Sequence, residues 1–146
     1  GYNHQAMCKL EITLQGARKI WQRDWTSKVC SPVIHEGNIY WSWRDVYCVD
    51  FDSGELKWKG PSGLGDPGSC VVTADDRLLV LADEGSLLLL DTASRSPQKA
   101  NVLFRKDRLF RTDAWPHVVF TGRHLFCKDR AGNIKCFSVE GQSTSE

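Results

Sequence analysis

The feature of this sequence that most constrains its fold is an internal repeat of about 40 to 47 residues. The segments "CSPVIHEGNIYW", "SCVVTADDRLLV" and "WPHVVFTGRHLF" share one pattern, in which Ile39, Leu78 and Leu125 occupy matching places. A second hairpin pattern follows each copy: "RDVYCVDF", "DEGSLLLLD" and "RAGNIKCFS". Each unit therefore holds roughly four short strands, which is the size of one propeller blade.

The remainder of the chain fits the same architecture. Short runs of five or six residues alternate between apolar and polar positions, Gly, Asp, Asn or Pro separates them, and no long window has helical spacing. We therefore predict an all-β chain, a β-propeller of four-stranded antiparallel blades, with about three and a half blades. The predicted units are a partial propeller over 1–139 (a blade ending over 5–22 and blades over 29–59, 69–104 and 115–139) and a flexible tail over 140–146.

The composition limits the classes of function. Hydrophobic residues are 41% and charged residues 25%, which is the balance of a globular protein. The net charge of +1, without any run of Lys and Arg, argues against a nucleic-acid partner. The longest apolar run, around Leu87 to Leu90, is too short to span a bilayer, so we expect no transmembrane segment.

The number of blades raises a question of closure. Complete propellers have about four to eight blades, and an open arc would leave apolar blade faces in water. We therefore expect this chain to be the C-terminal part of a larger ring, whose remaining blades are its partner. The alternative is a homodimer in which two arcs close one ring.

Five of the six cysteines occupy repeat-equivalent positions. The two equivalent sets are Cys8, Cys48 and Cys136, and Cys30 and Cys70. Equivalent sites on neighbouring blades are expected to lie more than about 7 Å apart, beyond disulfide reach, so we predict small buried core residues. The alternative is a disulfide between Cys127 and Cys136 across one hairpin.

Motifs for catalysis or metal binding do not emerge from the sequence. The segment "GLGDPG" has the spacing of a dinucleotide-binding loop, but a strand pattern follows it where that motif requires a helix, so we predict a loop between blades. The four histidines are not spaced as ligands, and a hydrogen-bonded structural role is expected for them. His117, at a strand start, is the one that could line a central face.

The first complete unit carries a family resemblance. Its matching residues are Ser31, Pro32 and Val33, then Gly37, Ile39 and Tyr40, then Cys48, Asp50, Gly54 and Trp58. This pattern resembles the β-propeller repeats related to pyrroloquinoline-quinone (PQQ) alcohol dehydrogenases, with Cys48 in place of the usual Ala. It looks closest to exported, non-enzymatic members from bacteria such as planctomycetes. The later units depart from the pattern, since no G-x-x-x-W follows Asp91.

The resemblance implies a structural role, a location and a function. It implies that Trp21 and Trp58, which end their blades, dock between neighbouring blades. It also implies an exported protein of the periplasm or cell envelope. The quinone enzymes need a calcium site, a base Asp and commonly a Cys-Cys pair, and this chain has no Cys-Cys pair and nothing that matches a calcium cluster. We therefore predict a non-catalytic binding or scaffolding module, with no catalytic, cofactor-binding or metal-binding residues. The alternative is a fragment of a PQQ-dependent dehydrogenase whose cofactor site lies in other blades.

One face of the predicted arc remains as a candidate surface for a protein or glycan partner. The loops 22–28, 59–68 and 105–115 and the turns 43–45, 83–85 and 129–131 are expected to share it. They carry Arg23, Trp25, Trp43, Arg44, Arg108, Arg111, Trp115 and Arg130. Arg and Trp are enriched at binding hot spots. The alternative interpretation is that the Trp side chains pack between blades and the Arg side chains are solvated.

Overall fold

The computed structural model describes residues 4–139, apart from the side chain of Glu84. Over these residues the chain is all-β, with thirteen strands, one short 3-10 turn and no α-helix. Every strand pair is antiparallel and joins strands that are consecutive in the sequence. The prediction of an all-β chain of consecutive hairpins is therefore confirmed.

The strands form four sheets, which we call blades 1 to 4 in chain order. Blade 1 contains β1 (Met7–Thr13) and β2 (Gly16–Arg23). Blade 2 contains β3 (Val33–His35), β4 (Asn38–Trp43), β5 (Asp45–Asp50) and β6 (Leu56–Ser62). Blade 3 contains β7 (Ser69–Val72), β8 (Arg77–Leu81), the 3-10 turn η1 (Asp83–Gly85), β9 (Leu87–Asp91) and β10 (Val102–Lys106). Blade 4 contains β11 (Val119–Thr121), β12 (His124–Lys128) and β13 (Ile134–Ser138).

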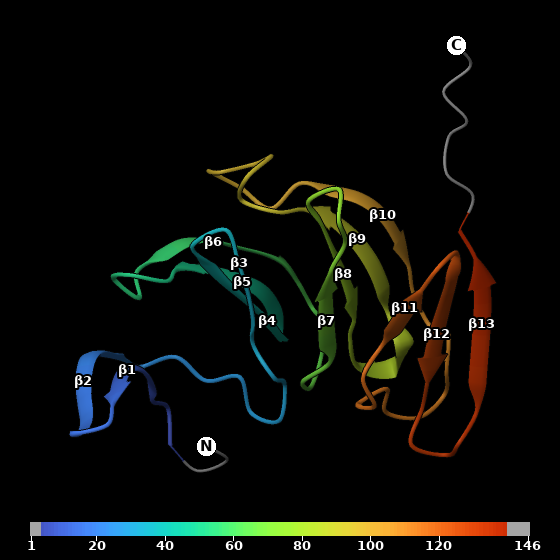
Figure 1. Ribbon diagram of the computed structural model, residues 1–146. Helices are drawn as coiled ribbons and strands as arrows, with labels where there is room; N and C mark the ends of the chain where they lie inside the picture. The colour runs from blue at the N-terminus through green and yellow to red at the C-terminus, as the bar shows by residue number, and fades with distance from the viewer. Residues whose placement is uncertain (1–3, 140–146) are drawn as a thin grey trace.

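The four blades follow one another around an open arc (Figure 1). Blades 2 and 3 each have four strands, whereas blade 1 has two and blade 4 has three. Blades 1 and 4 lie at opposite ends of the arc (Figure 1). The predicted propeller of four-stranded blades is confirmed for the part of the chain that the structure describes, whereas the predicted tail over 140–146 lies outside it.

Local sequence explains the tight hairpins. In blade 2, His35 pairs with Asn38, so the turn between β3 and β4 contains only Glu36 and Gly37. Their φ angles are +45° and +68°, the left-handed conformation that a two-residue turn requires at both positions. Gly37 adopts this conformation without steric cost.

The middle strands of blades 2 and 3 are buried on both faces. Tyr40 and Trp41 are consecutive in β4, so their side chains point to opposite faces of the sheet, yet neither is exposed. Val80 and Leu81 show the same burial in β8. Each of these blades is therefore packed between two neighbours, and the blade junctions supply the hydrophobic core.

The junction between blades 1 and 2 is closed by an indole. Trp21 of β2 is 7% exposed and donates a hydrogen bond from Nε1 to the Phe51 carbonyl oxygen (3.0 Å). Its ring lies against Gly54, where an added Cβ would come within 2.8 Å of the ring carbons. Gly54 thus has two reasons to be Gly: a φ of +70° and this close approach.

The junction between blades 2 and 3 repeats this arrangement. Trp58 of β6 is 4% exposed and donates from Nε1 to the Ser96 carbonyl oxygen (3.1 Å) in the turn between β9 and β10. Tyr40 packs against its ring, with centroids 5.9 Å apart. The Tyr40 hydroxyl also accepts a hydrogen bond from the Ala93 backbone N–H of blade 3 (2.9 Å). This is the placement that the repeat resemblance implies for the blade-ending Trp.

The buried cluster at the junction between blades 3 and 4 is mostly aliphatic and contains no Trp. Leu79, Leu81 and Leu87 of blade 3 form a cluster with Leu125 of blade 4 and with the segment that joins the two blades. That segment contributes Leu109, Phe110, Ala114 and Val118. The Val118 backbone N–H also donates to the Ser69 hydroxyl (2.8 Å).

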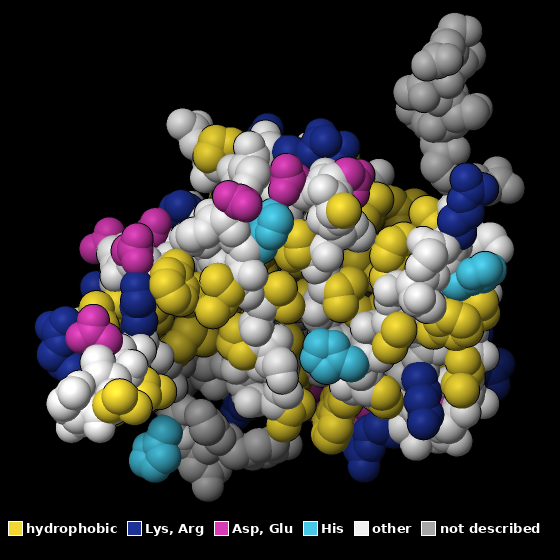
Figure 2. Space-filling model, in the orientation of Figure 1, with side chains coloured by type: hydrophobic (Ala, Val, Ile, Leu, Met, Phe, Trp, Pro, Cys, Tyr) yellow, Lys and Arg dark blue, Asp and Glu magenta, His cyan; other side chains and the backbone are white. Residues whose placement is uncertain are grey.

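Apolar side chains are exposed at both ends of the arc. In blade 1, Ile12 is 77% exposed and Leu10 is 49% exposed. In blade 4, Ile134 is 64% exposed and Val119 is 49% exposed. Figure 2 shows hydrophobic side chains at the surface of both end blades. These end faces resemble blade faces that lack a neighbour.

We predict that the Trp21 contact makes Gly54 less tolerant of a side chain than Gly37. Both residues have a φ near +70°, so each Ala variant bears a similar backbone cost of about 1–2 kcal/mol. Only the Gly54→Ala variant would also overlap the Trp21 ring, because an added Cβ at Gly37 meets no atom within 4 Å. Overpacking of this kind costs a further ~1–3 kcal/mol. Urea unfolding should therefore place Gly54→Ala below Gly37→Ala in stability.

A double-mutant cycle isolates the contact. In a Trp21→Ala background the extra cost of Gly54→Ala should disappear, because the ring that it overlaps is gone. Equal destabilisation by the two glycine variants in the native background would show that the indole does not hold this junction.

Candidate binding surface at the loop edge

One edge of the arc gathers the loops that connect successive blades, together with the turns between the middle strands. We call the segments 22–28, 43–45, 59–68, 83–85, 105–115 and 129–131 the loop edge. Backbone hydrogen bonds join three pairs of these segments. The Arg44 N–H donates to the Gly65 carbonyl (2.9 Å), the Leu109 N–H to the Gly85 carbonyl (3.0 Å), and the Arg130 N–H to the Asp113 carbonyl (2.9 Å). These bonds connect the turns of blades 2, 3 and 4 to the loops beside them, and segment 22–28 is not among the segments that they join.

A side chain completes this series. The Asp66 N–H donates to Oδ2 of Asp83 (3.2 Å), which joins the loop between blades 2 and 3 to the 3-10 turn η1. The predicted hairpin turn over 83–85 is thus a single 3-10 turn, held by this contact and by the Gly85 N–H bond to the Ala82 carbonyl (3.1 Å). The "GLGDPG" segment lies in the same loop, and strand β7 follows it, as predicted for a loop between blades.

The first Arg–Trp pair lies at the turn between β4 and β5. The Arg44 guanidinium lies 4.8 Å from the centroid of the half-buried Trp43 ring, and the Lys28 ammonium lies 5.4 Å from it. Arg44 is exposed, and its φ of +61° is unusual for a residue with a long side chain. Two cations thus lie close to one indole, within the range of a cation–π attraction.

The second Arg–Trp pair lies at the turn between β12 and β13. The Arg130 guanidinium lies 4.5 Å from the centroid of the Trp115 ring, and its Nη1 donates to Oδ2 of Asp113 (2.8 Å). The Trp115 Nε1 is buried and has no hydrogen-bond acceptor within residues 4–139. An unpaired buried N–H costs about 1–3 kcal/mol, and the contact with the Arg130 guanidinium is attractive and opposes that cost.

The other predicted surface residues divide between packing and exposure. Trp25 packs against Trp41 and Tyr47, with ring centroids 6.4 and 6.2 Å away, and its Nε1 donates to the Gly54 carbonyl (2.9 Å). It contributes to the junction between blades 1 and 2, as the alternative interpretation expected for the Trp residues.

The remaining three predicted residues are arginines. Arg23 is half-buried at the end of β2 and donates to the Gln22 carbonyl (3.0 Å). Arg108 and Arg111 are exposed in the loop between blades 3 and 4. The structure therefore brings four of the eight residues together as two Arg–Trp pairs and leaves two more Arg exposed on the same edge.

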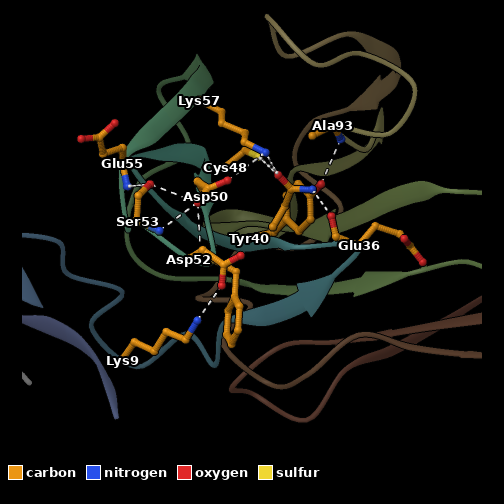
Figure 3. Close-up of polar contacts among 12 residues, drawn as sticks. Lys9, Glu36, Tyr40, Cys48, Asp50, Asp52, Ser53, Glu55, Lys57 and Ala93 are labelled. Carbon is orange, nitrogen blue, oxygen red and sulfur yellow. Dashed lines mark hydrogen bonds and ion pairs between the residues drawn. The ribbon is translucent and has the colours of Figure 1, made fainter. Parts of the chain in front are cut away.

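The repeat residues of the opposite edge stabilise the turns (Figure 3). Asp50 accepts hydrogen bonds at Oδ1 from the backbone N–H groups of Asp52 and Ser53 (3.0 and 2.9 Å) and from the Ser53 hydroxyl (3.0 Å). These bonds, with Lys57 nearby, lower the pKa of Asp50 to about 2. Because its folded-state pKa is depressed, this carboxylate stabilises the turn above about pH 4 and loses that effect as the pH falls toward 2.

Sequence analysis did not anticipate a polar pocket at this opposite edge. The pocket has a volume of about 690 Å³ and is lined by Glu36, Asn38, Lys57, Ser94 and Gln98, among others. The Lys57 ammonium donates to the Asn38 Oδ1 (2.7 Å), and the Asn38 Nδ2 donates to the Glu36 carbonyl (2.6 Å) (Figure 3). These two bonds pair the Lys57 ammonium and the Asn38 amide with other lining groups of the pocket. The lining comes from two blades, so no single sequence segment signals the pocket.

His35 acts as a structural contact, as expected for the histidines. Its Nε2 lies 2.7 Å from Oδ1 of Asp76, so the first turn of blade 2 is joined to the first turn of blade 3. His117, the residue considered for a central face, is exposed in the loop before β11. Within the described residues no group of three or more His, Cys, Asp or Glu side chains is arranged to hold a metal ion.

The cysteines are all free thiols, and four of them are buried. The predicted buried role is correct for Cys30, Cys48 and Cys70 but wrong for Cys8 and Cys136, which are exposed. Cys127, which lies outside the two equivalent sets, is also buried. The alternative disulfide across the last hairpin is wrong, because Phe126 and not Cys127 pairs with Cys136. Neighbours along a strand point to opposite faces, so the two thiols lie on different sides of blade 4.

Cys30 and Cys70, which occupy equivalent positions on neighbouring blades, are both free, as expected. The neighbouring Cys30 thiol, together with burial, raises the pKa of Cys70.

Thiol labelling should separate the two exposed cysteines from the four buried ones. Burial raises the pKa values of Cys48 and Cys127 to about 11, so at pH 8 they are almost entirely protonated as well as covered. We expect an aromatic disulfide reagent at pH 8 to modify Cys8 and Cys136 quickly in the folded protein, and all six in urea. The Cys8→Ser/Cys136→Ser variant is the control, and rapid native labelling of that variant would contradict the burial.

The fold and this edge define a class: an all-β protein whose propeller-like blades form an open arc with one connected loop edge. No protein-family model matches the chain, and no curated protein matches it. Among solved structures it is similar to the crystal structure of the computationally designed Ika4 protein. The TM-score is 0.64 at 9% sequence identity, over 84% of this chain and 74% of that chain. At this identity the similarity concerns the fold alone.

No helix in residues 4–139 combines the length and the apolar character that crossing a membrane would need.

Proposed function

We propose that this chain is a non-catalytic binding or scaffolding module built from PQQ-like repeats, and that it presents the loop edge to a protein or glycan partner. The observation that carries the proposal is the pair of exposed arginines, Arg44 and Arg130, each held over an indole on one continuous edge. Arginine and tryptophan are the side chains that most often dominate binding interfaces.

The residues that match the repeat pattern hold the turns and the blade junctions together without the two Arg–Trp pairs. Tyr40, Asp50, Gly54 and Trp58 already have partners that hold turns and junctions together. Arg44 and Arg130 lie instead on the solvent-exposed surface, and the Arg130 side chain is 56% exposed. Side chains that are ordered by an indole but remain exposed lose little conformational freedom when a partner binds.

Backbone conformation adds support. Lys28, Arg44 and Arg108 have φ angles between +53° and +61°, and all three lie on the loop edge. A left-handed conformation is unfavourable for residues with a long side chain, and it persists where surrounding structure imposes it. Three basic side chains are thereby projected from fixed backbone positions on one edge.

We also propose that the arc belongs to a larger ring, and the exposed end faces support this. Ile12 and Ile134 are largely exposed on blades 1 and 4, whereas the middle strands of blades 2 and 3 are covered on both faces. The partners that fit these faces are further blades of the same propeller or a second copy of the chain. Export to the periplasm or cell envelope rests on the repeat resemblance and is part of the same proposal.

We predict that simultaneous removal of both Arg–Trp pairs strongly weakens partner binding without unfolding the blades. The variant is Trp43→Ala/Arg44→Ala/Trp115→Ala/Arg130→Ala, measured on an array of acidic and neutral glycans and with candidate protein partners. Hot-spot truncation of this kind weakens binding about 30-fold or more. Arg18→Ala is the control, because Arg18 is exposed on β2 and pairs with Glu11 in the same hairpin.

Three outcomes would count against this proposal. Binding that survives the fourfold variant would place the binding surface elsewhere. An unfolded fourfold variant, with the single variants Arg44→Ala and Arg130→Ala folded and fully active in binding, would make the pairs structural. Stoichiometric binding of PQQ together with Ca²⁺ would favour the competing hypothesis, a fragment of a quinone-dependent dehydrogenase.

The native mass of the protein tests whether the arc associates with further blades or with a second copy to complete a ring. Light scattering after gel filtration should show a species larger than the 16.5 kDa chain, because the apolar faces of blades 1 and 4 favour association. A discrete dimer would indicate two arcs that close one ring, and a polydisperse mixture would indicate end faces that require other blades. A stable monomer with no tendency to associate would contradict the need for a neighbour.

A further inference from the structure

An apolar groove lies between blades 3 and 4, on a different part of the molecule from the loop-edge Arg–Trp pairs. It has a volume of about 630 Å³. Its apolar walls include Leu79, Leu87, Leu89 and Phe104 from blade 3, and Phe120 and Phe137 from blade 4. Sites for small molecules typically enclose about 300–1,000 Å³ and are mostly apolar, so this groove has the size and the character of one.

Strand register explains why this junction is open. In blade 2, Trp58 pairs with Cys48, which stands two residues before the Asp that ends the third strand. In blade 3, Phe104 pairs with Leu89, which stands two residues before the equivalent Asp. Phe104 therefore occupies the position of the junction-closing indole.

Phe104 does not close its junction. It is 50% exposed, whereas Trp58 is 4% exposed. A benzyl side chain is smaller than an indole and has no N–H that could bond to the neighbouring blade. The space that an indole fills at the other two junctions is thus available to a ligand at this one.

A cation lies beside this space. Lys106 lines the groove two residues after Phe104 on β10, on the same side of the sheet. The other cation of the groove, Arg77, is already engaged by Asp91 and Asp75. Among the described residues no carboxylate lies within ion-pair distance of the Lys106 ammonium, which leaves it available to an anion. The Asp75 carboxylate accepts from the Thr73 hydroxyl (2.6 Å) and pairs with Arg77, so its charge is compensated locally.

We propose that this groove binds an aryl acid, a flat apolar body of two fused or linked rings with one acidic group. The rings lie against Phe104, Phe120 and Leu89, where the other junctions hold an indole, and the acidic group lies at Lys106. Flat rings suit the groove because aromatic walls favour stacked and edge-to-face contacts. A single acid suits it because, within residues 4–139, Lys106 has no carboxylate partner and the rest of the lining is mostly apolar.

The test uses 1-anilinonaphthalene-8-sulfonate as the probe, followed by its fluorescence. We expect saturable binding with one site per chain. Phe104→Trp places an indole in the groove, as Trp58 does one blade earlier, and should weaken binding about tenfold or more. Leu103→Trp is the matched control, because Leu103 is the neighbouring exposed residue on the same strand and does not line the groove. This control should leave the affinity unchanged.

The charge is tested separately. Lys106→Gln should lower the affinity for the anionic probe severalfold, but it should leave the affinity for the uncharged analogue N-phenyl-1-naphthylamine unchanged. Displacement of the probe by 2-naphthoate would support the aryl acid. Displacement by dodecanoate and not by 2-naphthoate would overturn it, because an alkyl chain shares the charge and lacks the flat body.

Other results would also overturn the proposal. Equal probe affinity in wild type and in folded Phe104→Trp would place the probe on the exposed end faces of the arc. If Phe104→Trp does not fold, Phe120→Trp fills the groove from blade 4 and must give the same loss. Arg130→Ala should leave probe binding intact, so failure of the loop-edge proposal and failure of this one are distinguishable.

Discussion

The structure depends on one interaction, an indole that crosses from the last strand of a blade to the next blade. Blades 1 and 2, and blades 2 and 3, meet through Trp21 and Trp58, each of which buries its ring and donates its N–H to a backbone carbonyl of the neighbour. A four-stranded sheet cannot bury both of its faces alone, so each blade is stable only when flanked. The indole provides apolar area and a directional bond at the same contact, and this determines where the next blade lies.

Once the junctions are fixed, the two edges of the arc have different roles. The edge opposite the loop edge uses Asp50 and Tyr40 to satisfy backbone groups and to bind one blade to the next. On the loop edge the backbone contacts hold the segments together, while Arg44 and Arg130 extend outward over their indoles. The division follows from connectivity, because only the loop edge carries the segments between blades, and these segments tolerate variation in sequence.

Sequence periodicity was sufficient for the strands and their order, and for part of the candidate surface. The alternation around Ile39, Leu78 and Leu125 predicted three equivalent hairpins because period-two patterns and tight turns are local properties. Sequence periodicity did not predict the contacts between blades. The role of Trp25 depends on the rotation of one sheet relative to the next, which no local pattern encodes. The groove at Phe104 became visible only through strand register, because β10 lacks the spacing that marks the earlier blade endings.

The distribution of indoles has a consequence for observing this protein. Five of the six Trp residues, from Trp21 to Trp58, belong to blades 1 and 2 and their loops, blade 3 has none, and Trp115 alone stands before blade 4. Intrinsic fluorescence therefore reports almost entirely on the first half of the arc. A molecule whose last blade had separated would keep most of its native emission, so optical melting curves and hydrogen exchange at β12 would describe two different events.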